Sequence, residues 1–454
     1  MSLQAGASEM REDERAMSEH RLTIVFMPES AYGPTNNCVG IGRVLERRGH
    51  RVIFAAEASW KGRLEPLGFE EDLVDLAPPA SAGEGAEQDA GQFWTDFITE
   101  TAPEFRKPTI RQLETFIEPV FRSLIDGAKY CEPRLKEILD RAEPDVIVED
   151  NVSVFPALLT HGAPFVRIMS CNPLEMKDPD LPPTFSGYAA EDHAGRHDFR
   201  AEYERTHRAL WDETNDWVRE QGAPPLPELE FIHESPDLNL YVYPEIADYS
   251  RSRPLGSTWH RLDSSVRGTE DDFEVPAALA GGEGSLIYLS LGSLGSADVE
   301  LMRRLVDVLG RTPHRYIVSK GPRAGDFDLP DNMWGEARVP QTSIIPLADL
   351  VITHGGNNTT TEAFHFGKPM IVLPLFWDQY DNAQRVQELG SGARLDTYAF
   401  EEREMHDAIE RLLGDTVLRE RMAKESEEIR RRDGTAKAAD LIEDLGRRRR
   451  GSRR

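Results

Sequence analysis

The chain has 454 residues, of which 39% are hydrophobic, and its formal net charge is −27. This length suits two or three domains, each with a core of its own. The negative charge argues against a nucleic-acid-binding protein, and the lack of any run of about 20 apolar residues argues against a membrane span. The charged stretch 1–20 lacks the apolar centre of a secretory signal, so we expect a disordered tail and a cytoplasmic protein.

Two smaller features fit the same picture. Cys38, Cys131 and Cys171 are odd in number and lack the spacing of metal ligands, which predicts free thiols in a reducing compartment and no metal site. The last eight residues, 447–454, contain six arginines. We expect a solvated, disordered basic tail there rather than a tether to an anionic surface.

The first part of the chain reads as a strand–loop–helix–strand unit. Residues 22–27 form a short apolar run, and a glycine-containing loop follows at 30–37. Helical spacing over 39–48 stops at a glycine, and 52–56 is the next apolar run. Repeated units of this kind predict a parallel sheet.

Further strands and two long loops complete this first series. Apolar runs at 145–148, 165–169 and 239–243 predict strands, and the first of them ends in Glu149 and Asp150. The segments 77–92 and 172–197 are rich in glycine or proline and show little periodicity. Such loops in an α/β domain commonly contribute to a ligand pocket.

A second series begins after a linker predicted at 244–284. Residues 286–291 read as a strand, 292–296 as a glycine loop and 298–309 as a helix, in the same order as at the start of the chain. Later strands are expected at 316–318, 350–352 and 370–373. Two doubly wound domains in tandem place the carboxyl edges of their sheets across a cleft.

The segment 353–379 carries the strongest functional signal. An apolar run stops at His354-Gly355-Gly356, and a polar helix start follows. The first N–H groups of a helix lack internal partners, so a glycine turn and a helix start make an anion site. The next apolar run leads into Asp378 and Gln379, which belong to the same sheet edge. Phosphate donors and a carboxylate–amide pair are therefore expected to face one crevice, although a plain βαβ unit with a capping histidine is the simpler alternative.

From Pro340 to Gln379 this ordered string resembles the nucleotide-sugar signature of the family 1 UDP-sugar-dependent glycosyltransferases. Weaker similarity covers most of 21–441. The resemblance implies the GT-B fold, an α/β architecture of two Rossmann-like, doubly wound parallel-sheet domains. It also implies inverting transfer of a hexose, with glucose expected, from a UDP-sugar to a hydrophobic small molecule such as a natural product, phenolic, macrolide or lipid-like aglycone. No metal or cofactor is required, since helix starts and His354 hold the diphosphate. No nucleic acid partner or stable membrane insertion is expected, and the oligomeric state stays open.

The expected domain division follows from these observations. It is a tail at 1–20, an acceptor-binding domain at 21–243, a linker at 244–284, a nucleotide-sugar-binding domain at 285–415, helices that cross back to the first domain at 416–446, and a basic tail at 447–454.

The resemblance assigns the donor site residue by residue. The implied set is Ser293, Arg338, Gln341, His354, Gly356, Asn357, Asn358, Thr359, Glu362, Asp378 and Gln379. Within it His354 contacts the diphosphate, Glu362 accepts from the ribose hydroxyls, and the pair at 378–379 holds the sugar hydroxyls. Arg338 stands where relatives have an aromatic residue that stacks on uracil. A guanidinium plane can also stack on a base, but a surface arginine is an equal alternative, so the base preference stays open.

The catalytic base departs from the family pattern. Relatives place a histidine in the loop after the first strand, whereas this chain has Pro34, which cannot accept a proton. Asp150, which matches the carboxylate that normally orients that histidine, is the favoured base, and Glu29 is the second candidate. Glu149 points to the other side of its strand, and His50 more simply ends its helix.

The acceptor pocket is expected to use Tyr32, Phe93, Met169 and Asn172. Because Pro34 breaks the usual dyad, two alternatives stay open: a GT-B-like auxiliary protein that binds nucleotide without transfer, and a transferase acting on a carbon, amine or already acidic nucleophile.

Overall fold

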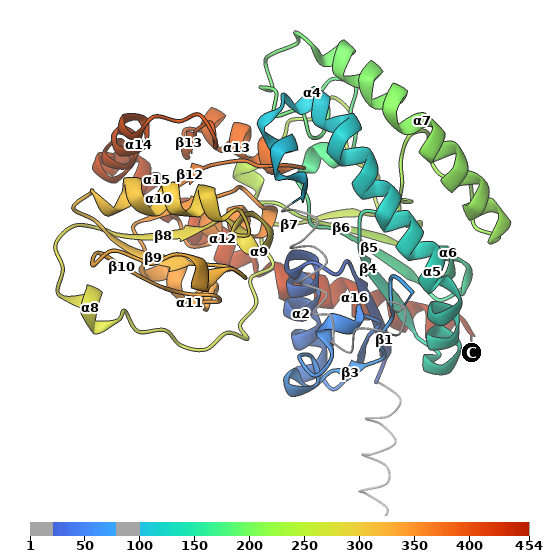
Figure 1. Cartoon of the computed structure of the whole chain (residues 1–454). Coiled ribbons are helices and arrows are strands. Elements are labelled where there is room, and N and C mark those ends of the chain that lie inside the picture. Colours follow the sequence, from blue (N-terminus) through green and yellow to red (C-terminus); the bar gives the residue numbers. More distant parts are fainter. Residues whose placement is uncertain (1–20, 79–99, 454) are drawn as a thin grey trace, which may run out of the picture.

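The computed structural model describes residues 21–78 and 100–453, which form two α/β lobes (Figure 1). Each lobe is built on one fully parallel sheet, with strand order β3-β2-β1-β4-β5-β6-β7 in the first and β10-β9-β8-β11-β12-β13 in the second. This architecture confirms the predicted fold class of two doubly wound parallel-sheet domains.

The strands of the first sheet are β1 (Thr23–Pro28), β2 (Arg51–Phe54), β3 (Glu70–Glu71), β4 (Val146–Asp150), β5 (Phe165–Met169), β6 (Leu238–Val242) and β7 (Trp259–Leu262). Those of the second are β8 (Leu286–Ser290), β9 (Arg315–Ser319), β10 (Met333–Glu336), β11 (Leu350–Thr353), β12 (Met370–Val372) and β13 (Gly392–Arg394).

The helices of the first lobe are α2 (Tyr32–Arg47), α4 (Thr109–Gln112), α5 (Glu118–Ala142), α6 (Pro156–Thr160) and α7 (Arg196–Glu220). The remaining helices are α8 (Ala277–Ala280), α9 (Gly292–Gly295), α10 (Val299–Gly310), α11 (Gln341–Ile344), α12 (Asn357–His365), α13 (Gln379–Glu388), α14 (Glu402–Gly414), α15 (Thr416–Arg432) and α16 (Gly434–Arg453).

Strand β1 shows why the sheet strands read as continuous apolar runs. Its side chains alternate between faces: Ile24 and Phe26 pack into a core with α2 and α16, whereas Val25 and Met27 pack into a second core with α5 and α6. Helices thus cover both faces of the sheet, and neither face needs polar side chains. In the second sheet every residue of β8, β11 and β12 is likewise buried.

The C-terminal helices divide at Asp433, which adopts a left-handed backbone conformation with φ of 41°. Before it, α15 packs against α12 of the second lobe, where the Ser426 hydroxyl donates to the His365 carbonyl at 2.6 Å. After it, α16 packs against α2 and β7 of the first lobe (Figure 1). The chain therefore returns to the first sheet only in its last helix.

Three sequence expectations need correction. Of the segment 416–446, expected to cross back to the first domain, only the part in α16 does so, because α15 packs against α12 of the second lobe. The segment 244–284 is not only a linker, because β7 lies within it and pairs in parallel with β6 as the seventh strand of the first sheet. The basic end is not a disordered tail, because 447–453 continue α16. Arg450 there bonds both carboxylate oxygens of Asp145 at 2.6 Å, and Arg447 bonds Glu443 at 2.9 Å. The strand β7 is too short to give a clear apolar run, and Asp145, the partner of Arg450, is distant in sequence, so neither feature could be predicted from local patterns.

Among the described helices, none combines the length and apolar character needed to cross a bilayer. The three cysteines carry free thiols.

Candidate active site

Two turns meet at the carboxyl edge of the second sheet. Thr353 at the end of β11 is in register with Ser290 at the end of β8, so the chain leaves both strands side by side. A Cβ atom built on Gly292 would lie 2.8 Å from Cε1 of His354, and one built on Gly356 would lie 2.6 Å from its Nε2. The imidazole therefore fits here only because positions 292 and 356 are glycines. Ser293 is exposed in the short helix α9 beside it.

The imidazole of His354 is neutral at neutral pH. Burial lowers its pKa to about 4, and a contact with the Ser290 backbone only partly opposes this effect. A neutral ring can donate a hydrogen bond to a diphosphate but offers no charge. The backbone N–H groups at the start of α12 would have to supply the remaining electrostatic stabilisation of the phosphate charge.

The first turn of α12 bridges the two lobes. The Asn357 amide donates to the Val242 carbonyl at 3.0 Å, and the Asn358 amide donates to the Gly33 carbonyl at 2.9 Å. Asn37 in turn donates to Oδ1 of Asn358 at 3.0 Å. Asn357 and Asn358, both in the predicted donor set, are thus engaged with the acceptor lobe, which closes the cleft at this point.

Glu362, on α12, accepts hydrogen bonds at both carboxylate oxygens. Gln341 donates to Oε2 at 2.6 Å, and Arg267 donates to Oε1 at 2.9 Å. Gln341 also reaches the Thr359 hydroxyl at 3.2 Å. Gln341, Thr359 and Glu362 belong to the predicted donor set, whereas Arg267 lies in the segment interpreted as a linker and carries no recognisable local signal.

Arg338 faces the acceptor lobe. Its guanidinium carbon lies 4.8 Å from the centroid of the Tyr32 ring, which also contacts Trp60 at 5.3 Å. The Tyr32 hydroxyl accepts a hydrogen bond from Arg63 at 2.7 Å. The structure therefore joins a predicted donor residue to a predicted acceptor residue, and the stacking of Arg338 on a nucleobase stays a prediction.

Asp378 and Gln379 stand at the start of α13. Oε1 of Gln379 accepts from the backbone N–H groups of Leu375 and Phe376 at 3.0 and 3.2 Å, which fixes the turn that precedes the helix. Trp377 in that turn has φ of 57°, a left-handed conformation that is unfavourable for a bulky residue. Such local strain persists where the surroundings hold it in place, commonly at functional sites.

Asn172 connects this turn to the acceptor lobe. Its backbone N–H donates to Asp378 at 2.8 Å, and its amide donates to Asn382 at 2.9 Å and to the Tyr243 hydroxyl at 3.2 Å. Burial raises the pKa of Asp378 to about 7. Asn172, Tyr243 and Asn382 are fully buried. The last two were missed from the sequence, although Asn382 lies one helical turn after Asp378 and this spacing could have indicated it.

The two candidate bases lie together at the edge of the first sheet, because Pro28 is in register with Asp150. Oδ1 of Asp150 accepts from the Ser170 hydroxyl at 2.7 Å, while its Oδ2 is buried without a hydrogen bond among the described residues. Burial raises the pKa of Asp150 well above its ordinary value. Glu29 instead accepts from Ser30 and from the Ala31 N–H at 2.8 Å each, which holds the start of α2.

The loop at 172–197 docks on the donor lobe. Asp381 in α13 accepts from the N–H groups of Phe185 and Gly187 at 2.6 and 2.8 Å. Met169, predicted to contact the acceptor, is buried at the end of β5. Phe93 and most of the predicted loop at 77–92 lie outside the described residues.

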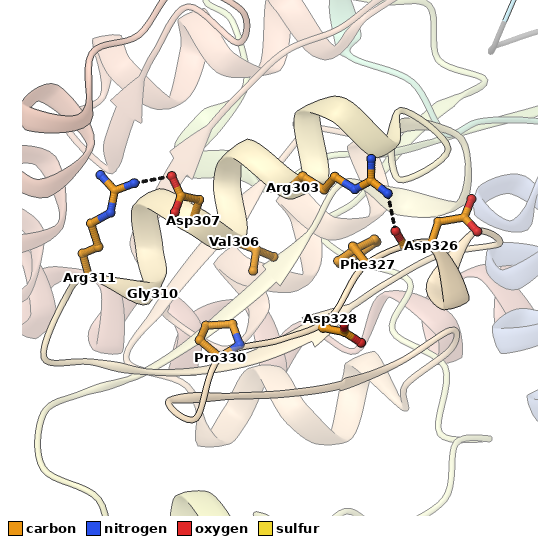
Figure 2. A pocket seen from close by; sticks show the side chains of 9 residues that line it. All are labelled: Arg303, Val306, Asp307, Gly310, Arg311, Asp326, Phe327, Asp328 and Pro330. Carbon is orange, nitrogen blue, oxygen red and sulfur yellow. Dashed lines mark hydrogen bonds and ion pairs between the residues drawn. The ribbon is translucent and has the colours of Figure 1, made fainter.

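A groove of about 530 Å³ lies elsewhere, along α10 of the second lobe. Figure 2 shows Arg303 and Phe327 at one end and Arg311 and Pro330 at the other. None of the predicted site residues lines this groove, so the candidate active site is the polar cluster between the lobes.

The chain is similar to known glycosyltransferases. Residues 303–445 match the family described as erythromycin biosynthesis protein CIII-like, C-terminal domain. Over 320 residues the chain is 27% identical to the NDP-glycosyltransferase YjiC of Bacillus licheniformis, covering 68% of this chain and 74% of the relative. Over 430 residues it is 25% identical to the oleandomycin glycosyltransferase of Streptomyces antibioticus, covering 92% and 90%. The comparisons support a family 1 glycosyltransferase with the GT-B fold.

Solved structures show the same fold. The glycotransferase of kitacinnamycin aligns with a TM-score of 0.65 at 23% identity, covering 94% of this chain and 99% of that one. The spinosyn rhamnosyltransferase complexed with thymidine diphosphate aligns with a TM-score of 0.59 at 20% identity, covering 92% and 100%.

Proposed function

We propose that this family 1 glycosyltransferase transfers a hexose, with glucose expected, from a UDP-sugar to a hydrophobic small-molecule acceptor with inversion. One observation carries the proposal. Ser170 and Asn172 lie two residues apart after β5, and they bond the candidate base Asp150 and the candidate sugar-binding residue Asp378, respectively. A single short segment thus links the candidate base to the candidate sugar-binding residue, and this link supports the proposal.

The mechanism that fits this arrangement is a direct displacement. Asp150 takes the proton from the acceptor hydroxyl, whose oxygen forms a bond to the anomeric carbon as the bond to the diphosphate breaks. Negative charge grows on the departing diphosphate, where the His354 turn and the start of α12 can donate hydrogen bonds. Burial supports Asp150 as the base, because a raised pKa brings a carboxylate closer to neutrality.

The choice of Asp150 over Glu29 rests on hydrogen bonding. Glu29 uses both carboxylate oxygens to hold the Ser30-Ala31 turn. Oδ2 of Asp150 accepts no hydrogen bond of ordinary geometry within the described part of the chain, and the nearby Asn37 amide only partly opposes the rise of the Asp150 pKa. Asp150 is buried in the closed arrangement, so the lobes must separate to admit substrates and then close around them.

The proposal is tested by incubating the purified chain with UDP-glucose or TDP-glucose and a panel of phenolic, macrolide and lipid-like aglycones. We expect mass spectrometry to detect a hexosyl product with UDP-glucose, and NMR to show an anomeric configuration opposite to that of the donor. Asp378→Ala should abolish the product, and EDTA should have no effect. Tight nucleotide binding with neither transfer nor donor hydrolysis would favour the auxiliary protein suggested by Pro34, whereas a product from TDP-glucose alone would change the donor assignment.

A further inference from the structure

We propose that Arg267, which reaches the donor lobe from the segment after β7, positions Glu362 to accept a hydrogen bond from a ribose hydroxyl of the nucleotide. This inference rests on the proposed function and adds a residue to its donor site. The Arg267 side chain is only 10% exposed, and that of Glu362 is only 3% exposed. The pair is therefore built into the protein rather than lying on its surface.

Arg267 is held at both ends of its guanidinium group. One nitrogen donates to Oε1 of Glu362 at 2.9 Å, and another forms an ion pair with Glu270. Glu270 is fixed in turn, because its second oxygen accepts from the N–H and the hydroxyl of Thr342 at 2.6 and 2.8 Å. A guanidinium group suits this bridging role because its donors form a rigid fork.

Glu362 is held from its other side as well. Gln341 donates to Oε2 at 2.6 Å, and the Tyr288 hydroxyl fixes Gln341 by donating to its Oε1 at 2.9 Å. Each carboxylate oxygen can accept two hydrogen bonds. After the bonds from Arg267 and Gln341, Glu362 therefore has a fixed orientation and still has acceptor capacity for a hydroxyl group.

The net charge of the cluster formed by Arg267, Glu270 and Glu362 determines which ligand group it can bind. Glu362 and Glu270 together carry two negative charges against the single positive charge of Arg267, so the cluster repels a phosphate and favours a hydroxyl donor. Burial raises the pKa of Glu362, and Arg267 opposes that rise. Without Arg267 the carboxyl group would be held less firmly and would take up a proton more readily, and it would then accept hydrogen bonds less well.

The test compares the binding of UDP and 2′-deoxy-UDP by calorimetry, which needs no turnover. For the wild type we expect UDP to bind about 10- to 100-fold more tightly, the range for one hydrogen bond to a charged acceptor. Arg267→Met should reduce this ratio to near 1, mainly through weaker UDP binding, and Glu362→Gln should reduce it similarly. The exposed Arg311→Met, along α10, is the matched control and should leave the ratio unchanged.

Two results would overturn the inference: equal binding of the two nucleotides by the wild type, or an unchanged ratio in Arg267→Met. If the methionine variant does not fold, Arg267→Lys keeps the charge but cannot bridge both glutamates, and an unchanged ratio in that variant would overturn the inference equally. Failure of the proposed function would give a different result. If Arg267→Met lowers the binding ratio as expected but the wild type transfers no sugar, the transferase assignment is wrong and the role of Arg267 in ribose binding stands.

Discussion

Replacement of Asp150 by asparagine tests the catalytic assignment most directly. Asparagine keeps the shape of the side chain, and its carbonyl oxygen can still accept the hydrogen bond that the Ser170 hydroxyl now gives to Oδ1. The group at the Oδ2 position becomes an NH₂, which cannot take a proton. The change therefore removes the base without removing the contact that orients it.

The expected loss follows from the usual contribution of a general base. Turnover should fall about 10²- to 10⁴-fold, which corresponds to roughly 2.7–5.5 kcal/mol of transition-state stabilisation. The base must be ionised, so kcat/KM of the wild type should rise with pH through the pKa of Asp150, which burial raises above its ordinary value of 3.8. This acidic limb should be absent from the variant.

The thermal stability of Asp150→Asn should rise, although its activity falls. A carboxyl group whose folded-state pKa is raised stabilises the fold at low pH, and that contribution is lost as pH rises through the folded-state pKa. Asp150→Asn should therefore unfold at a higher temperature than the wild type at pH 8, with a smaller difference at pH 5. Initial rates with saturating donor and thermal melts at both pH values measure the two effects.

Glu29→Gln is the matched control for this experiment. Its carbonyl oxygen can still accept from the Ala31 N–H, which Glu29 now bonds at 2.8 Å, so turnover should stay within a few-fold of the wild type. A near-normal rate in Asp150→Asn would show that Asp150 is not the general base. A large loss in Glu29→Gln alone would transfer the role of base to Glu29.

Three further predictions follow from the site and the C-terminal helix. His354→Ala should weaken UDP binding. In the wild type, the affinity for UDP should not change between pH 5.5 and 8 through titration of His354, because burial lowers the pKa of that imidazole to about 4 and the ring gains charge only below this value. Calorimetry at several pH values measures the affinity, and a change in this range would contradict the prediction. Asn358→Ala removes the hydrogen bond to Gly33 and the one accepted from Asn37. We therefore expect the free energy of unfolding, measured in urea, to fall by about 1–3 kcal/mol. An unchanged unfolding midpoint would show that other contacts hold the lobes together. Arg450→Ala should cost no more than about 1 kcal/mol in the same assay, since its ion pair is partly solvated; a larger loss would mean that the end of α16 carries more of the fold.

The sequence by itself determined the fold and indicated a candidate donor site. Apolar runs separated by glycine turns predict parallel strands wherever helices cover both sheet faces, as around β1. The ordered string around His354 predicts a helix start at a sheet edge, and the structure places that imidazole between Gly292 and Gly356. These features depend on local spacing, which a linear sequence records.

Only the tertiary structure decided which groups meet across the two lobes. Arg267 bonds Glu362 and Asn172 bonds Asp378, although each pair is far apart in the chain. The arginines of the last helix also find a partner in Asp145, so a segment that reads as a charged tail becomes part of a packed lobe. Such pairings arise when elements distant in sequence are packed together, and no local spacing in the chain encodes them.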